Sequence, residues 1–566
     1  MEATAAHTAV AYFSMEIGLD ASIPTYSGGL GVLAGDTIKA AADLGLPMAA
    51  VTLIHRKGYF TQRLQASGEQ LESAAEWLPS AHFEELPERV RVQVDGEEVA
   101  VRCWRYIVKG YHGGEVPVYF LDTDLPENSP YGRALTDCLY GGDTRYRLAQ
   151  EVILGIGGVT LLRALGYVNL RAFHMNEGHS ALLTVALLEE QVGGRGLGAV
   201  GSADHEAVRE RCVFTTHTPV PAGHDQFPLE LAREILGNER VDGLLSLDCC
   251  VDHTLNMTYL ALSFSRYVNG VAMRHGQVSR GMFPKYPIAS ITNGVHVPTW
   301  TSRPFQQLFD EFIPRWRADV QNLRYAVSIP IERVRSAHEA CKATLLDAVH
   351  ARTGRKLDAR VMTIGYARRA ATYKRADLIF QDLDRLRSMA RSVGPIQLVY
   401  AGKAHPRDAE GKAMIRRVFE AAEHLRDAVQ VVYLENYDME IASFLIGGVD
   451  IWLNTPQKPQ EASGTSGMKA AINGVPSLSV LDGWWIEGHV EGVTGWSIGD
   501  SWEDGDGDVG RESAELYDKL ERVILPLFYG KPAGYGQVMR SCISLNGSFF
   551  NARRMVLQYR ENAYRL

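Results

Sequence analysis

The segment 461–469, Glu-Ala-Ser-Gly-Thr-Ser-Gly-Met-Lys, combines the residue types of an anion-binding loop with a single lysine. It follows the strand-like run 449–453 and leads into a helical pattern, for which Thr465 or Ser466 is a good N-cap. The N-terminus of a helix binds anions, and Lys469, which we place in the first turns, opposes the dipole there. Such conflicts are typical of functional sites. The segment predicts a Schiff-base lysine for a phosphate-bearing cofactor; the alternative is a solvated helix lysine beside a tight turn.

A second basic group follows the strand-like run 361–366. Arg368, Arg369, Lys374 and Arg375 stand within eight residues at a predicted strand-to-helix turn. Guanidinium groups bind phosphate oxygens in pairs, and cations at this end of a helix again oppose its dipole. The turn therefore predicts a site for one or two phosphates. The alternative is an exposed basic turn.

Polar residues also stand at the ends of two other strand-like runs. His217 follows the run 213–216, and Asn293 follows the run 288–291. Each residue alone is more often a structural hydrogen-bonding group. Together with the carboxylates Glu16 and Glu461, they fit a polar pocket for sugar hydroxyls.

A glycine-rich loop, residues 26–31, precedes another helical pattern. The spacing Gly29-x-Gly31-x-x-Ala34 formally matches the dinucleotide-binding fingerprint, but no acidic ribose ligand accompanies it. We therefore favour a backbone-amide cradle next to a sugar or phosphate.

Metal-binding patterns are weak, because the sequence has neither a CxxC pair nor an HExxH motif. The acidic run 504–508 resembles a calcium loop, but Val509 stands where that loop requires glycine, which favours a solvated acidic loop. Trp484 and Trp485 predict either a sugar-stacking platform or two buried core indoles.

The elements that must position these residues alternate between short β-rich runs and longer helical patterns. Alternation of this kind predicts parallel sheets with helices on both faces, and such sheets bind ligands at the carboxyl ends of their strands. A hinge between two α/β halves is predicted at 293–300. The runs interpreted as buried strands are 10–15, 48–54, 213–216, 361–366, 396–400, 429–434 and 449–453, and the clearest helices are 145–165 and 378–392.

Composition narrows the class of protein. With 566 residues the chain is too long for one hydrophobic core. A net charge of −9 argues against nucleic acid as the main partner, and the apolar stretches are too short for a membrane span. The N-terminus does not resemble a signal peptide, and the seven cysteines follow no disulfide framework, so we expect reduced thiols in a cytoplasmic protein.

Taken together, the segments resemble the α-glucan (glycogen, starch or maltodextrin) phosphorylases in their short bacterial and archaeal form. This resemblance implies an α/β GT-B fold, in which two Rossmann-like domains enclose the active site in a cleft. The expected domains are 1–299 for glucan binding and catalysis and 300–545 for pyridoxal 5'-phosphate, with a helix at 546–566 packing back on the first domain. The motifs that carry the resemblance are 11–16, 173–180, 367–375, 401–405, 461–469 and 481–485.

The resemblance also implies the roles of individual residues. Lys469 would bind pyridoxal 5'-phosphate as a Schiff base, and His217, Arg369, Lys374 and Lys469 would be the catalytic residues. Arg369 and Lys374 would bind substrate phosphate. The other cofactor-binding residues would be Arg368, Thr465, Ser466, Gly467, Tyr437, Trp300 and Glu16. The transferred glucosyl unit would be held by His217, Gly28, Gly29, Leu30, Asn293, Tyr373, Glu461, Ser463 and Gly464.

The implied reaction is retaining phosphorolysis of terminal α-1,4-glucosyl units of an α-glucan by inorganic phosphate, giving glucose 1-phosphate. In this family the cofactor phosphate acts as a proton relay against the substrate phosphate. The expected partners are the glucan and phosphate, without nucleic acid, membrane or resident metal, and a homo-oligomer is compatible with the sequence. The nucleotide effector and phosphorylation control of the long forms are not expected. Two alternatives remain: a nucleotide-sugar-dependent GT-B α-glucan synthase, and a catalytically silent glucan-binding protein.

Overall fold

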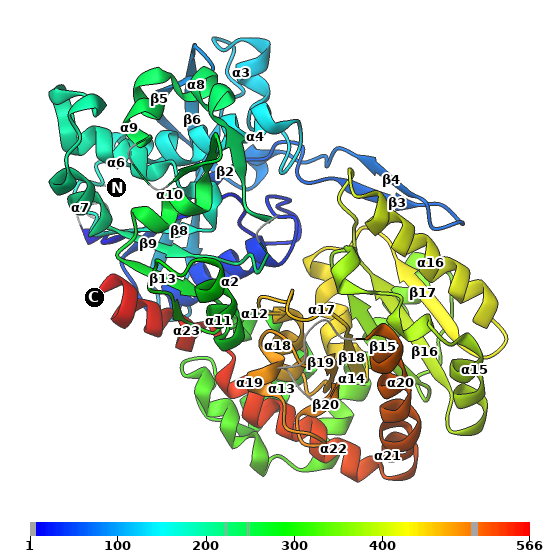
Figure 1. The fold of residues 1–566 in the computed structure, drawn as a ribbon. Helices are drawn as coiled ribbons and strands as arrows, with labels where there is room; N and C mark the ends of the chain where they lie inside the picture. The colour runs from blue at the N-terminus through cyan, green and yellow to red at the C-terminus, as the bar shows by residue number, and fades with distance from the viewer. Residues whose placement is uncertain (1–6, 221–222, 246, 248, 500–507) are drawn as a thin grey trace.

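The computed structural model describes residues 7–499 and 508–566, except for 221–222, 246 and 248. The fold is mixed α/β, with a large sheet early in the chain and a second sheet later (Figure 1). Among the described residues, no helix has the length and apolar character needed to span a membrane.

The first sheet has nine strands in the order β14-β13-β9-β8-β1-β2-β7-β6-β5. Neighbours from β14 to β7 are parallel, whereas β6 runs antiparallel to both β7 and β5. The purely parallel pattern expected from the sequence is therefore wrong at this edge. The strands are β1 Val10–Ser14, β2 Met48–Leu53, β5 Glu84–Val94, β6 Glu97–Lys109, β7 Glu115–Asp122, β8 Ala172–Asn176, β9 Cys212–Thr215, β13 Tyr267–Gly270 and β14 Ala289–Ser290.

The second sheet has six parallel strands in the order β17-β16-β15-β18-β19-β20. When the strands are numbered by their order along the chain, their order in the sheet is 3-2-1-4-5-6, as in doubly wound nucleotide-binding sheets. The parallel strands of the first sheet, numbered in the same way and read from β7, have the order 3-2-1-4-5-6-7. The order reverses between β15 and β18, and between β1 and β8. The strands are β15 Met362–Ala367, β16 Ile396–Ala401, β17 Gln430–Leu434, β18 Ile451–Asn454, β19 Ser477–Val480 and β20 Gly495–Ile498.

Both faces of the first sheet are covered, as expected from the sequence. In β1, Ala11 and Phe13 face one apolar cluster, while Val10 and Tyr12 face another. Helices α5 (Gly158–Ala164) and α6 (Leu183–Val192) contribute to the first cluster, and α2 (Gly29–Asp43) contributes to the second. Burial on both faces explains why these strands read as continuous apolar runs.

The predicted strands are confirmed to within about two residues, and so is the long helical stretch after residue 144. That stretch consists of α4 (Thr144–Val152), a π-helical turn and α5. The helix predicted at 378–392 begins later, because Asp382 caps α15 (Leu383–Ser392) by accepting a hydrogen bond from the Arg385 amide.

A hairpin of β3 (Thr61–Leu64) and β4 (Gln70–Ser73) leaves the first half of the chain. Figure 1 shows it extending towards α16 (Ala409–Leu425) and β17 of the second sheet. No strand pair was predicted here, because the polar residues of this segment do not alternate cleanly with apolar ones.

The end of the chain returns to the first sheet. Helix α23 (Ala552–Gln558) packs against α2, and Figure 1 places the C-terminus beside the first half of the chain. The Tyr564 hydroxyl lies 2.7 Å from His174 Nδ1, and the Tyr559 hydroxyl lies 3.1 Å from Thr215 Oγ1. These contacts join residues that are more than 300 positions apart.

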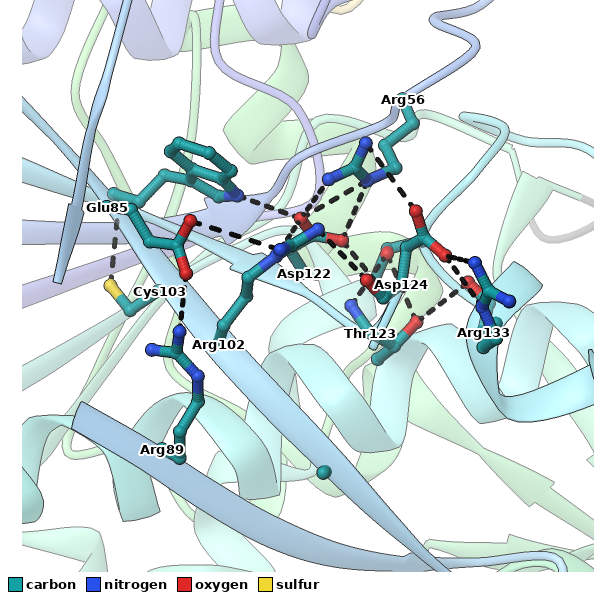
Figure 2. A network of polar contacts seen from close by, with 12 residues as sticks. Arg56, Glu85, Arg89, Arg102, Cys103, Asp122, Thr123, Asp124 and Arg133 are labelled. Atoms are coloured by element: carbon teal, nitrogen blue, oxygen red, sulfur yellow. Dashed lines mark hydrogen bonds and ion pairs between the residues drawn. The ribbon is translucent and has the colours of Figure 1, made fainter. Parts of the chain in front are cut away.

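An ion network stabilises the antiparallel edge of the first sheet (Figure 2). Asp122, at the end of β7, is fully buried and accepts hydrogen bonds from Arg56, Arg102 and the Trp104 indole at 2.7, 2.7 and 2.8 Å. Burial alone would raise the pKa of Asp122, but these partners outweigh it and lower that pKa. Arg56 precedes β3, so the network also anchors the base of the hairpin.

Asp122→Ala is expected to lower the free energy of unfolding by about 3–5 kcal/mol, because it removes the fully buried carboxylate that Arg56, Arg102 and the Trp104 indole share. Asp124→Ala, at a more exposed partner of Arg133, should cost about 1 kcal/mol or less. Urea unfolding of both variants measures the difference. The pKa of Asp122 is lowered in the folded state. Its contribution to the free energy of unfolding should therefore be complete near neutral pH and be lost as the pH falls through that pKa. Equal destabilisation by the two variants would contradict this account.

Candidate active site

The candidate residues gather where the strand order of each sheet reverses. The basic turn follows β15, and the 455–464 loop follows β18, its neighbour in the sheet. In the first sheet, Glu16 follows β1 and Glu177 follows β8. Parallel doubly wound sheets bind ligands at this position, at the carboxyl ends of the strands.

The loops of the two sheets meet at these edges. The Met439 amide of the second half donates to the Tyr26 hydroxyl of the first at 3.0 Å. His405 Nε2 lies 3.3 Å from the Tyr140 carbonyl, and the His405 ring centroid lies 6.1 Å from that of Tyr59. The loops at the carboxyl ends of the two sheets are therefore in contact.

Lys469 lies on α18 (Thr465–Ile472), and only 7% of it is exposed. Its Nζ stands 3.9 Å from the centre of the Trp300 ring, and the Trp300 indole donates to both carboxylate oxygens of Asp36 at 2.9 Å. Burial lowers the pKa of Lys469 to about 8, although Asp36 opposes the shift. A larger fraction of the side chain is then the neutral amine, which is the form that attacks a carbonyl.

Two local predictions about α18 are wrong. Its N-cap is Gly464, with φ 91°, and not Thr465 or Ser466. The helix has only eight residues, so Lys469 lies near its C-terminal end and does not oppose the dipole. The Ser466 hydroxyl instead accepts a hydrogen bond from the Trp452 indole at 3.1 Å. Thr465 and Ser466 still begin the helix, where first-turn amides lack intrahelical acceptors.

Asn473, which the sequence reasoning missed, fixes the lysine helix to the Trp300 segment. It is fully buried, and its amide donates to the carbonyls of Trp300 and Lys469 at 2.8 and 3.0 Å. Its oxygen accepts from the Ser302 amide at 2.8 Å. An Asn-Gly pair after a helical pattern is a helix-end signal that could have identified it.

The basic turn is mostly buried, so the exposed-turn alternative holds only for Arg369. The side chains of Arg368 and Lys374 are each 8% exposed, and both bind Glu461 Oε2, at 2.5 and 2.6 Å. Burial alone would raise the pKa of Glu461, but the two cations lower it to about 2. Arg369 forms no hydrogen bond or ion pair with any residue that the structure describes, and Arg368 Nη1 is buried without a partner there.

Arg375 does not belong to this group. Its guanidinium binds Glu512 at 2.5 Å and the carbonyls of Thr455 and Pro456 at 2.9 and 2.7 Å, so it anchors the neighbouring loop. The turn also leads into a short 3₁₀ turn, Thr372–Lys374, instead of the expected α-helix. These cations therefore do not oppose the dipole of an α-helix.

Three polar side chains have capacity for further hydrogen bonds. Nε2 of His217 lies 2.7 Å from Asn176 Oδ1, and burial lowers the His217 pKa to about 4. The ring is therefore neutral near pH 7, with Nε2 as the donor and Nδ1 as an acceptor. Asn293 Oδ1 and Ser463 Oγ are buried without a partner among the described residues. Sugar hydroxyls would supply such partners.

Glu16 lies beneath the glycine loop. It accepts hydrogen bonds from the amides of Ser27 and Gly28 at 2.5 and 3.3 Å, and from the Tyr140 hydroxyl at 2.9 Å. A Cβ at Gly31 would lie 2.6 Å from Glu16 Oε2, which explains the glycine there. The loop ends in α2, whose N-cap is Gly28 and whose first residues are Gly29 and Leu30.

The remaining aromatic candidates divide between the site and the core. Tyr373 stacks beside Lys374, whose Nζ lies 4.4 Å from the ring centre. Tyr437 is half-buried after β17; burial raises its pKa, and the nearby Arg368 charge opposes that shift. Trp484 and Trp485 are at most 1% exposed, so the core interpretation is correct for both.

The acidic run 504–508 lies outside the described residues, apart from Asp508. Within the described ranges, no group of three or more His, Cys, Asp or Glu side chains is arranged to hold a metal ion.

Asp482 is a further residue that the sequence reasoning missed. It is 2% exposed and accepts hydrogen bonds from the amides of Glu461 and Gly483 at 2.8 and 2.9 Å. Burial raises the pKa of Asp482 to about 7 despite these bonds. Its place before a glycine at the end of a strand-like run was the available signal. Asp482 thus fixes the backbone that presents Glu461.

Comparison with known proteins shows which family the sequence resembles. A family model described as carbohydrate phosphorylase matches residues 224–493, which contain Asn293, Trp300, the basic turn and Lys469. The maltodextrin phosphorylase of Thermococcus litoralis is 38% identical, over 98% of this chain and 70% of its own length. This chain belongs to the carbohydrate phosphorylase family.

Other carbohydrate phosphorylases match with similar coverage. The glycogen phosphorylase of Mycobacterium tuberculosis is 38% identical over 99% of this chain and 71% of its own length. That of Aquifex aeolicus is 34% identical over 98% of this chain and 86% of its own length. The carbohydrate phosphorylase relationship therefore extends beyond the matched model to the first sheet, which carries Glu16, the glycine loop and His217.

Proposed function

We propose that the protein is a pyridoxal-phosphate-dependent α-glucan phosphorylase, which transfers terminal α-1,4-glucosyl units to inorganic phosphate and releases glucose 1-phosphate. The observation that carries this proposal is the buried Lys469 against Trp300, on the helix that follows the Glu461 loop. Glu461 in turn contacts the basic turn. An amine with a lowered pKa and a cluster of cations are what an imine-bound cofactor and a phosphate substrate require.

The residues present fit the cofactor. Lys469 has a neutral amine available, and Thr465, Ser466 and Gly467 begin its helix, where a phosphate is favoured. The unpartnered Arg368 Nη1 is a further donor for that phosphate, and Trp300 and Tyr437 would border the ring. When bound, pyridoxal 5'-phosphate supplies a phosphate group that can exchange a proton with the substrate phosphate.

Arg369 and Lys374 would bind the substrate phosphate. Two phosphate groups in contact repel each other, and the fixed cations at 368, 369 and 374 offset that repulsion. Glu461 balances only part of this charge in the structure. The neutral His217 would accept a hydrogen bond from a glucosyl hydroxyl at Nδ1, and Asn293 and Ser463 would use their unpartnered oxygens in the same way.

The rest of the glucosyl site would come from the loops around these residues. The glycine loop at Gly28, Gly29 and Leu30 presents the first amides of α2, and Glu16 fixes its position. The remaining contacts would come from Tyr373, Glu461 and Gly464. Attack of phosphate on the face that the glucan leaves would retain the α configuration.

We also propose the GT-B arrangement, with domains at 1–299 and 300–545 and a returning segment at 546–566. Its support is the shared strand order of the two sheets and the packing of α23 on α2. We propose a cytoplasmic location, since all seven cysteines are free. The expected partners are an α-glucan and phosphate, and a homo-oligomer is compatible with the sequence.

Purified protein is expected to form glucose 1-phosphate from maltodextrin only when phosphate is present, and to extend maltodextrin from glucose 1-phosphate in reverse. The reason is that the buried Lys469 supplies the amine that an imine-bound cofactor requires, which a nucleotide-sugar transferase does not need. Chromatography of labelled products measures both directions. Extension from UDP- or ADP-glucose without extension from glucose 1-phosphate would favour the synthase instead.

A further inference from the structure

Two glutamines on the β3–β4 hairpin connect the first half of the chain to the basic turn. We propose that Gln62 and Gln70 are positioning residues that hold the backbone presenting Arg369 to the substrate phosphate. This inference rests on the proposed function. The two side chains are 0% and 4% exposed, although glutamine is usually a surface residue.

Both glutamines bind the loop that follows β16. The Gln70 amide pairs with both backbone groups of Ala404: the Ala404 N–H donates to Oε1 at 3.0 Å, and Nε2 donates to the Ala404 carbonyl at 2.9 Å. Gln62 Nε2 donates to the Gly402 carbonyl at 2.9 Å and to Gln70 Oε1 at 2.8 Å. Gln70 therefore satisfies both backbone groups of the buried Ala404. The Gly402 carbonyl also accepts from the Tyr433 hydroxyl at 3.0 Å, so Gln62 adds a second hydrogen bond there.

The same loop holds the backbone on both sides of Arg369. The Arg368 amide donates to the Ala401 carbonyl at 3.2 Å, and the Ala370 amide donates to the Lys403 carbonyl at 2.9 Å. A Cβ at Gly402 would lie 1.9 Å from the Arg368 carbonyl oxygen, so the two chains are in close contact. Because the Arg369 side chain has no partner among the described residues, its position depends on this backbone.

Gln62 also fixes the loop that follows β17. The backbone N–H of Asn436 donates to Gln62 Oε1 at 2.9 Å, and the backbone N–H of Gln62 donates to Asn436 Oδ1 at 3.1 Å. Tyr437, proposed to border the cofactor ring, is the next residue. One buried side chain thus sets two strand-end loops of the second sheet.

The hairpin has other contacts with the second sheet. Leu64 packs on a small apolar cluster that includes Ala370 of the basic turn. Arg63 pairs with Glu435 at 2.6 Å, and its side chain is 72% exposed. This ion pair involves neither the basic turn nor the loop at 402–404. Removing Arg63 is therefore a matched control for removing either glutamine.

The test uses Gln62→Met and Gln70→Met, made separately, because methionine keeps the length of the side chain but none of the hydrogen bonds. Phosphorolysis is measured against phosphate concentration and, separately, against maltodextrin concentration, together with imine absorbance and Tm. Each glutamine variant should raise the KM for phosphate roughly ten-fold or more, because displacement by a fraction of an ångström weakens charged contacts. The KM for maltodextrin should change little in both variants, and the imine absorbance should change little in Gln70→Met, whose side chain does not contact the Tyr437 loop. Saturating phosphate should restore most of kcat.

Arg63→Ala should keep the wild-type KM for phosphate. An unchanged KM for phosphate in both glutamine variants would overturn the proposal, as would an equal increase in Arg63→Ala. Insoluble protein from both glutamine variants would also overturn it, because it would assign the pair to stability alone. A wild-type protein without phosphate-dependent turnover would instead reject the proposed function, and this inference with it.

Discussion

Lys469→Ala is expected to fold normally yet lack both the absorbance of a pyridoxal imine and almost all phosphorolysis. The Lys469 side chain is buried, its Nζ forms no hydrogen bond with a described residue, and burial lowers its pKa. Its removal therefore takes a poorly solvated cation out of the protein and should cost little folding free energy. Activity should fall by roughly 10³-fold, because the cofactor phosphate is the proposed proton relay.

Absorbance spectra, thermal unfolding and phosphorolysis rates of the variant measure the three effects. Lys356→Ala, at an exposed lysine, is the control and should match the wild type in all of them. If Lys469→Ala kept the imine absorbance, another lysine would hold the cofactor. If it kept activity without the absorbance, the cofactor would have no role in the reaction.

Arg369→Ala is expected to reduce phosphorolysis by roughly 10²–10³-fold, which corresponds to about 3–4 kcal/mol of transition-state stabilisation, while the cofactor remains bound. Arg369 is exposed and unpaired within the described chain, so this variant should unfold at the wild-type temperature. Lys374→Ala should lose similar activity but also stability, because it removes one of the two cations that bind the buried Glu461.

Steady-state rates across phosphate concentrations and thermal unfolding distinguish these outcomes. Arg407 is exposed and lies shortly after the loop at 402–404. Arg407→Ala therefore controls for a general loss of positive charge. Near-normal rates in both Arg369→Ala and Lys374→Ala would show that the turn does not bind substrate phosphate. A fall in rate that Arg407→Ala reproduces would point to long-range electrostatics instead.

The buried strands were predictable because a strand covered on both faces is a continuous apolar run, as β15 is. The hairpin β3–β4 was not, because two of its polar side chains, Gln62 and Gln70, are buried by partners far away in the sequence. Gln62 binds Asn436, 374 positions later, and no local pattern reports such a pair. The antiparallel strand β6 was missed for a related reason, since its pairing with β5 and β7 depends on the fold and not on composition.

The features of the site also divide into those that could be predicted from the sequence and those that could not. Residue types and their place after strands indicated Lys469, the basic turn and His217. What required coordinates was how the charges pair: Glu461 with Arg368 and Lys374, and Arg375 with Glu512. The predicted conflict between the cations and a helix dipole was wrong for both the Lys469 segment and the basic turn. It assumed longer helices, whereas the structure has an eight-residue helix and a 3₁₀ turn.

The most direct test of the central claim is borohydride reduction of the purified protein, followed by peptide mapping. The reagent reduces an imine to a stable amine, so the pyridoxyl mass stays on the lysine that carried it. The account predicts the label on the peptide containing Met468 and Lys469, and unlabelled peptides from Lys469→Ala. An active wild-type protein with no label on any lysine would contradict the account.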